Sequence, residues 1–243
     1  MKRSKEPFVR LPRPCGVASC PKPSYRLMQE IQPGAIAMAN LRPVSIHISK
    51  NTGTRLAEAA GDAIVNAGHR TAARWVAEHG AAATLFAVVR NPFDRVVSEY
   101  HFRRRRFKSG EANPHLANLH LPFTQWVIDA YRHGDYRTRA FFDCMGVPFN
   151  ERNMIDDTLL LFLPQVAWLA AGDGTLLVGD LLRFENLAAD WNAFADRHGI
   201  LGRLHRRNVS PRDARNRMYY DAETRALIAE YFSDDLAAFG YEF

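Results

Sequence analysis

The sequence has 243 residues, of which 47% are hydrophobic and 24% are charged, an ordinary globular composition with enough length to bury one substantial core. The formal net charge of +6 favours anionic partners without identifying them. The three cysteines Cys15, Cys20 and Cys144 are too few for a disulfide framework or a four-cysteine zinc site, so a reducing compartment is favoured.

Residues 1–40 combine prolines and basic residues without a sustained hydrophobic period, so we expect an extension that lies on the surface or is partly disordered. This segment has no apolar region of the kind that signal peptides carry. The longest apolar stretch, Leu159 to Ala171, is interrupted by Pro164 and is too short to span a bilayer. We therefore expect residues 41–243 to form a single domain of a soluble, cytoplasmic protein, most simply a bacterial one.

The first predicted elements are a strand, a turn and two helices. Val44 to Ile48 is an apolar run of strand length, and Ser49 to Gly53 is a polar turn. An alanine-rich helix is predicted from about Thr54 to Ala67, and helical spacing continues from His69 to His79. The order predicted so far is strand, loop, helix and helix.

A second strand and helix follow. Thr84 to Val89 is a compact apolar run that ends at Arg90, and Asn91-Pro92 then starts another helix. Later predictions are one strand and three helices, at Leu176 to Phe184, Phe123 to Arg132, Leu187 to His198 and Ala222 to Phe232. Strands that alternate with helices predict an α/β, P-loop-like three-layer fold in which a central, mainly parallel sheet is flanked by helices.

A first candidate site is the stretch HISKNTGTRL, His47 to Leu56, where a strand passes into a helix. Backbone N–H groups and the positive end of a helix dipole can converge there on an anion, and Lys50 can reach a bridging oxygen. The GxxxxGK[ST] spacing is absent, and no acidic partner for Mg²⁺ is evident at a strand end. The alternative is that Lys50 is a solvated loop lysine.

The second candidate site is FAVVRNPFDRVVSEY, Phe86 to Tyr100. It puts Arg90 at the carboxyl end of a strand, where open α/β sheets bind ligands, and Ser98 on the next helix. A guanidinium and a hydroxyl together can hold a phosphate. The alternative is that Arg90 only caps the sheet.

Together these two motifs resemble a known family. HISKNTGTRL resembles the HIPKTGGTSL-type 5′-phosphosulfate loop, and VRNPFDRVVSEY resembles the VRNPxxRxxSxY 3′-phosphate element, of the sulfotransferases that include carbohydrate O-sulfotransferases. Further segments, GHRTAARW, RFENLAADW and FGYEF, resemble parts of bacterial members. The resemblance covers roughly residues 44–243 and implies an enzyme that uses 3′-phosphoadenosine 5′-phosphosulfate (PAPS) as donor and no metal.

The resemblance also implies which residues bind the donor. They are Lys50, Asn51, Thr52, Gly53, Thr54 and Arg55 at the 5′-phosphosulfate, Arg90 and Ser98 at the 3′-phosphate, and Arg207 and Ser210 in a loop that closes over the nucleotide. Four of the loop residues depart from the family pattern, namely Ser49, Asn51, Thr52 and Arg55. The proline replaced by Ser49 would have made the loop more rigid, and Arg55 replaces a hydroxyl contact.

Sulfuryl transfer needs a base, and histidine suits that role near neutral pH. Of nine histidines we select His69, which resembles the histidine of the family's GHxTA-like element. His47 is expected to orient the loop from below, His101 could face an acceptor, and Glu185 is either an alternative base or, more simply, a structural partner. The run Arg103 to Arg106 is expected to be mainly solvated.

Other functions stay open on the sequence. A nucleotide-dependent phosphoryl transferase would use the same strand, loop and helix but needs Mg²⁺ ligands. A non-catalytic protein that binds nucleic acid would use the arginine runs, although no nucleic-acid motif is present. A sulfotransferase fold that binds PAPS without turnover also stays open, because the loop is altered at Ser49 and Arg55. The favoured partners are a nucleotide donor and a small hydroxyl acceptor, a carbohydrate or glycolipid by resemblance, without nucleic acid.

Overall fold

A computed structural model of the chain describes residues 42–51, 53–81, 83–108, 121–146, 153–155, 157–204 and 216–243. In these ranges no helix combines the length and the apolar character that crossing a membrane requires. The predicted extension of residues 1–40 lies outside the described residues.

The centre of the molecule is a parallel sheet of four strands in the order β2-β1-β3-β6. The strands are β1 (Val44–Ile46), β2 (Val65–Asn66), β3 (Leu85–Val89) and β6 (Asp180–Arg183). Val44 of β1 pairs with Val65 on one side and with Leu85 on the other. The predicted three-layer fold with a parallel central sheet is confirmed.

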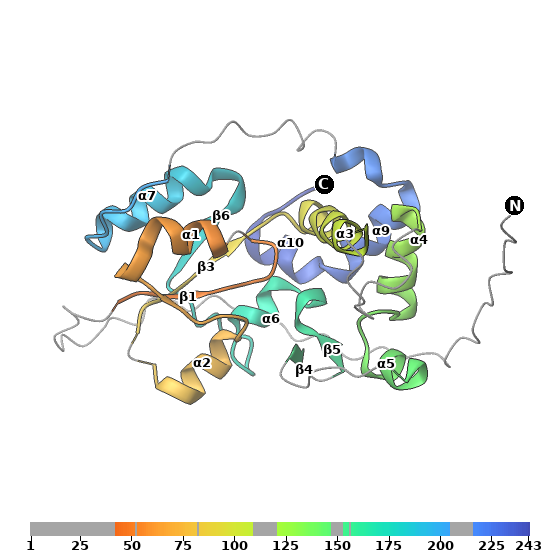
Figure 1. Cartoon of the computed structure of the whole chain (residues 1–243), viewed down its shortest axis with the longest axis horizontal. Coiled ribbons are helices and arrows are strands. Elements are labelled where there is room, and N and C mark those ends of the chain that lie inside the picture. The colour runs from red at the N-terminus through yellow and green to blue at the C-terminus, as the bar shows by residue number, and fades with distance from the viewer. Residues whose placement is uncertain are drawn as a thin grey trace, which may run out of the picture.

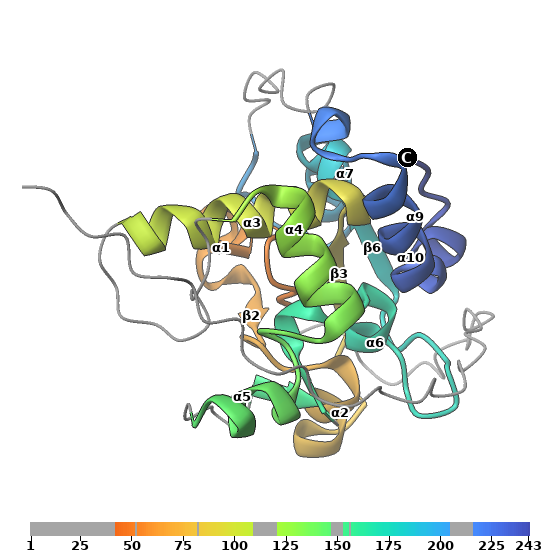
Figure 2. The same ribbon diagram turned by 90° about the vertical axis from the view of Figure 1, so that its right-hand side faces the viewer.

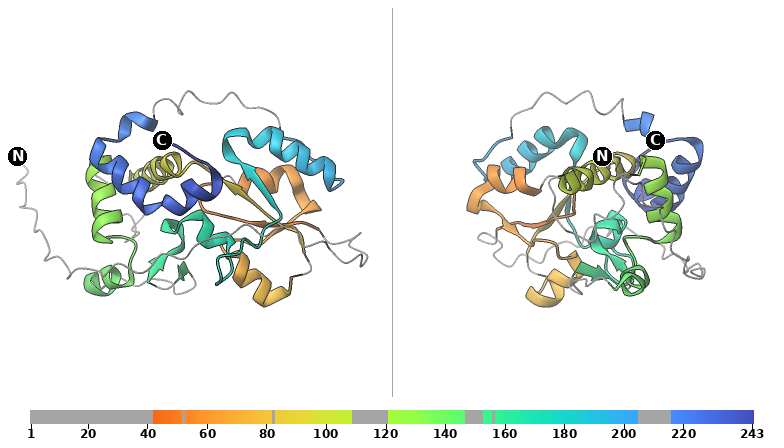
Figure 3. Two further views of the ribbon diagram at one scale, coloured as in Figure 1. Left: turned by 180° about the vertical axis from the view of Figure 1, so that it is seen from behind. Right: turned by 45° about the vertical axis from the view of Figure 1, so that its right-hand side comes forward.

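Helices cover both faces of this sheet (Figure 1). Phe86 and Val88 of β3 pack on α1 (Gly53–Ala60) and α7 (Leu187–Arg197), while the alternate residues of β3 pack on α2 (Ala72–His79) and α6 (Gln165–Leu169). Successive side chains of a strand point to opposite faces, so a strand buried on both faces is apolar throughout. Figure 3 shows the same two layers from behind.

The chain changes direction at β1. From β1 it passes through α1 to β2 at one edge, and from β2 through α2 to β3 on the other side of β1. The two crossover helices lie on opposite faces, as right-handed connections in opposite directions require. In such sheets a crevice opens at the carboxyl ends of the strands at the switch point, here between β1 and β3.

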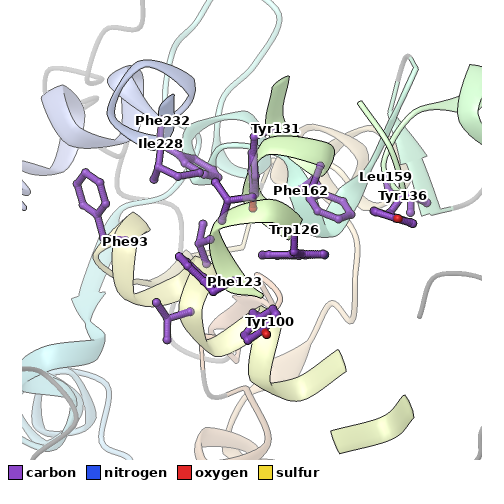
Figure 4. Packing of buried hydrophobic residues seen from close by; sticks show 14 of the residues in the cluster. Phe93, Tyr100, Phe123, Trp126, Tyr131, Tyr136, Leu159, Phe162, Ile228 and Phe232 are labelled. Atoms are coloured by element: carbon purple, nitrogen blue, oxygen red, sulfur yellow. The ribbon is translucent and has the colours of Figure 1, made fainter. Parts of the chain in front are cut away.

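A second, aromatic core lies beside the sheet (Figure 4). Its helices are α3 (Pro92–Lys108), α4 (Phe123–Val127) with the π-helical turn η3 (Ile128–His133), α9 (Ala222–Tyr231) and α10 (Ser233–Phe239). Figure 2 turns these helices toward the viewer. Val96, Val97 and Tyr100 of α3 are buried there with Trp126 and Phe232.

Several short elements were not predicted. They are α5 (Arg139–Met145), the antiparallel pair β4 (Met154–Ile155) and β5 (Thr158–Leu159), α6, α10, and the short turns η1 (Gly61–Ala63), η5 (Leu160–Phe162), η6 (Phe184–Asn186) and η7 (Arg217–Tyr219). The apolar stretch from Leu159 to Ala171 therefore holds β5, η5 and α6.

The predicted helix from Thr54 to Ala67 is too long. It ends at Ala60, because Gly61 adopts a left-handed φ of 52° that stops the helix. Val65 then pairs with β1 as an edge strand, which the sequence prediction missed. The predicted helix from His69 begins only at Ala72, where the Thr71 hydroxyl accepts a hydrogen bond from the Arg74 N–H.

Candidate functional site

The four parallel strands end at one edge of the sheet, and a polar candidate residue follows each of them. His69 follows β2, Lys50 follows β1, Arg90 follows β3 and Glu185 follows β6. The strand order therefore places these residues in the sequence His69, Lys50, Arg90, Glu185 along the edge. Adjacent strands lie about 4.8 Å apart, so the two central residues are neighbours at the switch point.

Arginines of the second motif hold the loop of the first motif. The Arg90 guanidinium donates through Nη1 to the Lys50 carbonyl at 3.0 Å, and Arg95 donates through Nε to the Ser49 carbonyl at 3.3 Å. Lys50 itself has a left-handed φ of 70°, a conformation that a non-glycine residue adopts only when its surroundings enforce it. The two motifs therefore form one structural unit.

The Lys50 ammonium lies against α3. Its Nζ is 3.5 Å from the centroid of the Phe102 ring, a cation–π contact. Burial lowers the pKa of Lys50 to about 8, while the nearby Glu99 carboxylate opposes the shift and the cations Arg105, Arg90 and Arg103 add to it. Such a lysine is still mostly charged at neutral pH.

Asn51 differs from the expectation that it lines the anion-binding surface. Its side chain is 2% exposed and turns into the protein. The amide Nδ2 donates to the Val88 carbonyl and to the Gln165 Oε1, each at 2.7 Å. A buried amide of this kind fixes the loop from behind and leaves the outer face of the loop to Lys50 and the start of α1.

The Arg90 side chain is held by several neighbours. Its Nε and Nη2 contact the Asp94 carboxylate, which lies one helical turn into α3, and its guanidinium stacks on Phe184 with 3.8 Å between the guanidinium carbon and the ring centroid. Together with the bond to Lys50, these contacts use three of the five N–H groups of a guanidinium. Ser98, also on α3, is half-buried.

The backbone turn after β3 is held by residues from distant parts of the chain. Glu185 accepts a hydrogen bond from the Asn91 N–H at 2.7 Å, and its second oxygen accepts one from the Tyr241 hydroxyl at 2.8 Å. The Asn91 side chain donates to the Glu242 carbonyl at 2.7 Å. Glu185 thus has the structural role that the sequence favoured, and the predicted FGYEF segment lies against the Arg90 turn.

Arg95 stands at the second fixed arginine of the VRNPxxRxxSxY pattern, but the sequence assigned it no role. It is 3% exposed and also donates to the carbonyls of Leu163 at 2.9 Å and Leu161 at 3.0 Å. Burial lowers the pKa of Arg95, although nearby acidic groups oppose this shift. The fixed arginine of the pattern was the signal that could have identified it, and its position beside the buried residues Val96 and Val97 indicated that it points into the protein.

His69 is exposed next to the loop. One ring nitrogen, Nδ1, lies 3.3 Å from the carbonyl of His47, and the two imidazole rings lie 4.8 Å apart. Burial and, second, His69 lower the pKa of His47, which favours its neutral form. His47 lies three positions before Lys50, so His69 contacts the chain segment that enters the loop.

Other candidate residues lie elsewhere. Arg103 is buried in an ion pair with Glu99 at 2.7 Å, so the prediction of a mainly solvated run is wrong for Arg103. It holds for Arg104 and Arg105, which are exposed, and the side chain of Arg106 lies outside the described residues. His101 hydrogen-bonds to Tyr219 at 2.8 Å.

Thr52, Arg207 and Ser210 lie outside the described residues, as do the side chains of Thr54 and Arg55. Within the described ranges no three His, Cys, Asp or Glu side chains group as metal ligands would.

A protein-family model described as "Sulfotransferase family" matches residues 69–242. The chain belongs to the sulfotransferase family. No curated protein and no solved structure matches this sulfotransferase significantly. Family membership supports sulfuryl transfer as the general activity, with a nucleotide donor and a small acceptor. The match begins at His69, so it includes the Arg90 motif but not the loop of Lys50, which contacts the matched region through Arg90 and Arg95.

Proposed function

We propose that this sulfotransferase moves a sulfuryl group from PAPS to a hydroxyl or amine acceptor by in-line displacement, with His69 as the base. The observation that carries the proposal is the order of His69, Lys50 and Arg90 along the carboxyl edge of the sheet. That order offers a base, a cation for the bridging oxygen and a cation for a second phosphate, in the sequence that a bisphosphorylated nucleotide would need.

The 5′-phosphosulfate would bind at the start of α1. Gly53 begins this helix, and the first backbone N–H groups of a helix have no partners within it, so they can bind an anion. Lys50 lies beside them and adds a full positive charge, which requires its ammonium to turn from Phe102 toward the ligand. Thr52, Thr54 and Arg55 would complete this end of the site.

The 3′-phosphate would bind at Arg90 and Ser98. The N–H groups of Arg90 and Asn91 in the backbone already donate to Gln165 and Glu185, so the side chains have to hold this phosphate. Arg90 retains two N–H groups beyond those that contact Asp94 and Lys50. Arg207 and Ser210 would close over the nucleotide.

His69 is suited to remove the acceptor proton. A carbonyl oxygen can only accept a hydrogen bond, so the contact of Nδ1 with the His47 carbonyl favours the tautomer with the proton on Nδ1. The lone pair is then on Nε2, the atom that would face the acceptor. The carbonyl of His47, which directly follows β1, would thus orient the base in the way that a carboxylate orients histidine in other enzymes.

In the reaction the acceptor oxygen bonds to sulfur while the bond from sulfur to the bridging phosphate oxygen breaks. His69 Nε2 takes the acceptor proton, and the bisphosphate product leaves with the bonding electron pair. Lys50 and the start of α1 stabilise the negative charge that develops on that oxygen. We favour a carbohydrate or glycolipid hydroxyl as acceptor, in line with the resemblance of the motifs.

The test is to incubate the protein with sulfur-labelled PAPS and fractionated metabolites, and to compare Lys50→Ala and His69→Ala with the wild type. We expect labelled product to fall by at least about a hundredfold in both variants. His79→Ala is the control, because His79 ends α2 and hydrogen-bonds only to the Trp75 carbonyl among the contacts described. Equal product from all variants would refute the assigned roles.

Nucleotide preference separates this proposal from phosphoryl transfer. The product nucleotide, 3′-phosphoadenosine 5′-phosphate (PAP), should raise the melting temperature, and ATP with Mg²⁺ should not. A shift with ATP and Mg²⁺ alone would favour the phosphoryl transferase instead.

A further inference from the structure

We propose that Gln165 and Asp235 are positioning residues of the sulfuryl-transfer site, which set the distance between its two anion-binding elements without touching the donor. Gln165 begins α6 and Asp235 lies in α10, so neither belongs to the two motifs. The inference rests on the function proposed above for its effect on the donor, whereas the contacts that carry it are independent of that function.

The Gln165 amide joins the phosphate loop to the Arg90 turn. Its Oε1 accepts hydrogen bonds from Asn51 Nδ2 at 2.7 Å and from the Arg90 N–H at 2.9 Å. Its Nε2 donates to the Arg90 carbonyl at 2.8 Å and to Asp235 Oδ2 at 3.1 Å. A side-chain amide has two donor hydrogens and two acceptor sites, so these four bonds use its full capacity.

The amide can take only one orientation. If its oxygen and nitrogen were exchanged, an NH₂ group would face the N–H donors of Asn51 and Arg90, and an oxygen would face two acceptors. Gln165 is fully buried, and an unpaired polar group there is costly. The same amide therefore determines how far the Asn51 loop lies from the Arg90 turn.

Asp235 fixes the amide in turn. Its carboxylate accepts the backbone N–H groups of Gln165 at 2.8 Å and Val166 at 2.9 Å as well as the Gln165 side chain. Asp235 is fully buried, and burial raises its pKa against the effect of these N–H donors. The start of α6 is thus attached to α10, and through Gln165 to both anion-binding elements.

This network is expected to act on donor binding. Lys50 and Arg90 lie on separate elements and would bind opposite ends of one nucleotide. An error of about 1 Å in such an arrangement can reduce the rate about a hundredfold. Substitution of a residue that is needed only for packing would instead lower the stability of the protein and leave the affinity of the folded protein for the donor unchanged.

The test compares Gln165→Met with Val166→Ala. Methionine keeps the length of glutamine and removes all four hydrogen bonds, whereas Val166→Ala removes buried apolar volume from the same helix and leaves the network in place. The readouts are hydrogen exchange of peptides that span residues 48–56 and 90–95, PAP affinity, and kcat and KM for PAPS, all well below the melting temperature.

In Gln165→Met we expect faster exchange in both peptides, PAP affinity at least about tenfold weaker and a raised KM for PAPS. Val166→Ala should melt at a lower temperature with wild-type exchange in both peptides and wild-type PAP affinity. Asp235→Asn places a donor NH₂ against the N–H groups of Gln165 or, in the other amide orientation, against that of Val166, so either way the start of α6 loses an acceptor. This variant should therefore reproduce the Gln165→Met pattern, which keeps the test available if Gln165→Met does not fold.

Wild-type exchange and affinity in both network variants, or equal loosening in Val166→Ala, would overturn the proposal. If the wild-type protein bound no PAP, the function proposed above would fail, and the exchange of the two peptides would still decide whether Gln165 sets the distance between them.

Discussion

At the scale of single residues, the surroundings of Lys50 determine how its side chain would bind an anion. Its ammonium is partly removed from water and lies on Phe102, and its pKa is lowered to about 8. An anionic ligand favours the charged form and would raise this pKa again. The positive charge of Lys50 that the ligand needs is therefore present at neutral pH. In the protein without ligand, this charge is lost as the pH rises through the pKa of Lys50, about 8.

We predict from this that PAP affinity falls by roughly tenfold or more between pH 7 and pH 9.5, because only the charged form of Lys50 attracts the phosphate. Lys50→Arg is the matched control, since a guanidinium stays charged throughout this range. Calorimetric titration at several pH values measures both profiles. A wild-type profile as flat as that of Lys50→Arg would contradict a role for the Lys50 ammonium in binding.

At the scale of elements, α3 belongs to the aromatic core and also supports the phosphate loop. Val96, Val97 and Tyr100 pack into the aromatic core. Arg95 of the same helix donates to three carbonyls. One of these carbonyls belongs to Ser49 of the loop. The geometry of the site therefore depends on the same helix that stabilises the fold.

Arg95→Met should lower the free energy of unfolding by about 3 kcal/mol, because three carbonyls lose a charged donor. This loss outweighs the desolvation cost that is avoided when the charged guanidinium is no longer buried. Arg104→Met is the control on the same helix, because Arg104 is exposed, and should change stability by no more than about 0.5 kcal/mol. Urea unfolding measures both. Similar midpoints for the two variants would show that the buried hydrogen bonds of Arg95 contribute nothing to stability.

At the scale of the whole molecule, the C-terminal residues hold the edge of the sheet where the site lies. The Tyr241 hydroxyl donates to Glu185 and lies 3.3 Å from the Val89 carbonyl, and the Glu242 carbonyl accepts from Asn91. The Phe243 ring packs edge-on against Phe93, with centroids 4.9 Å apart. The end of the chain thus completes the turn that carries Arg90.

Removal of the last three residues should therefore lower the free energy of unfolding by about 3 kcal/mol, through lost hydrogen bonds and aromatic packing, and should weaken PAP binding as well. Tyr241→Phe is the control, since it removes only the hydroxyl contacts and should cost about 1 kcal/mol. Thermal unfolding with and without PAP measures both effects. Wild-type PAP affinity in the truncated protein would show that residues 241–243 do not contribute to the binding site.

Local features of the sequence were sufficient for part of this result. Strand β3 is a continuous apolar run because it is buried on both faces, and Asn91-Pro92 starts α3 because proline is compatible with the first turn of a helix. The edge strand β2 has only two residues, and its existence depends on pairing with β1, so its local pattern was assigned to the preceding helix instead.

The sequence by itself determined the alternation of strands and helices, the two motifs and the identity of Lys50, Arg90 and His69 as candidates, because each of these depends on residues close together in the chain. Only the tertiary structure decided the order β2-β1-β3-β6 that aligns them, the inward direction of Asn51 and the contact of Gln165 with Asp235. Those depend on hydrogen bonds between segments up to 114 residues apart, whose partners become specific only when burial excludes water as an alternative.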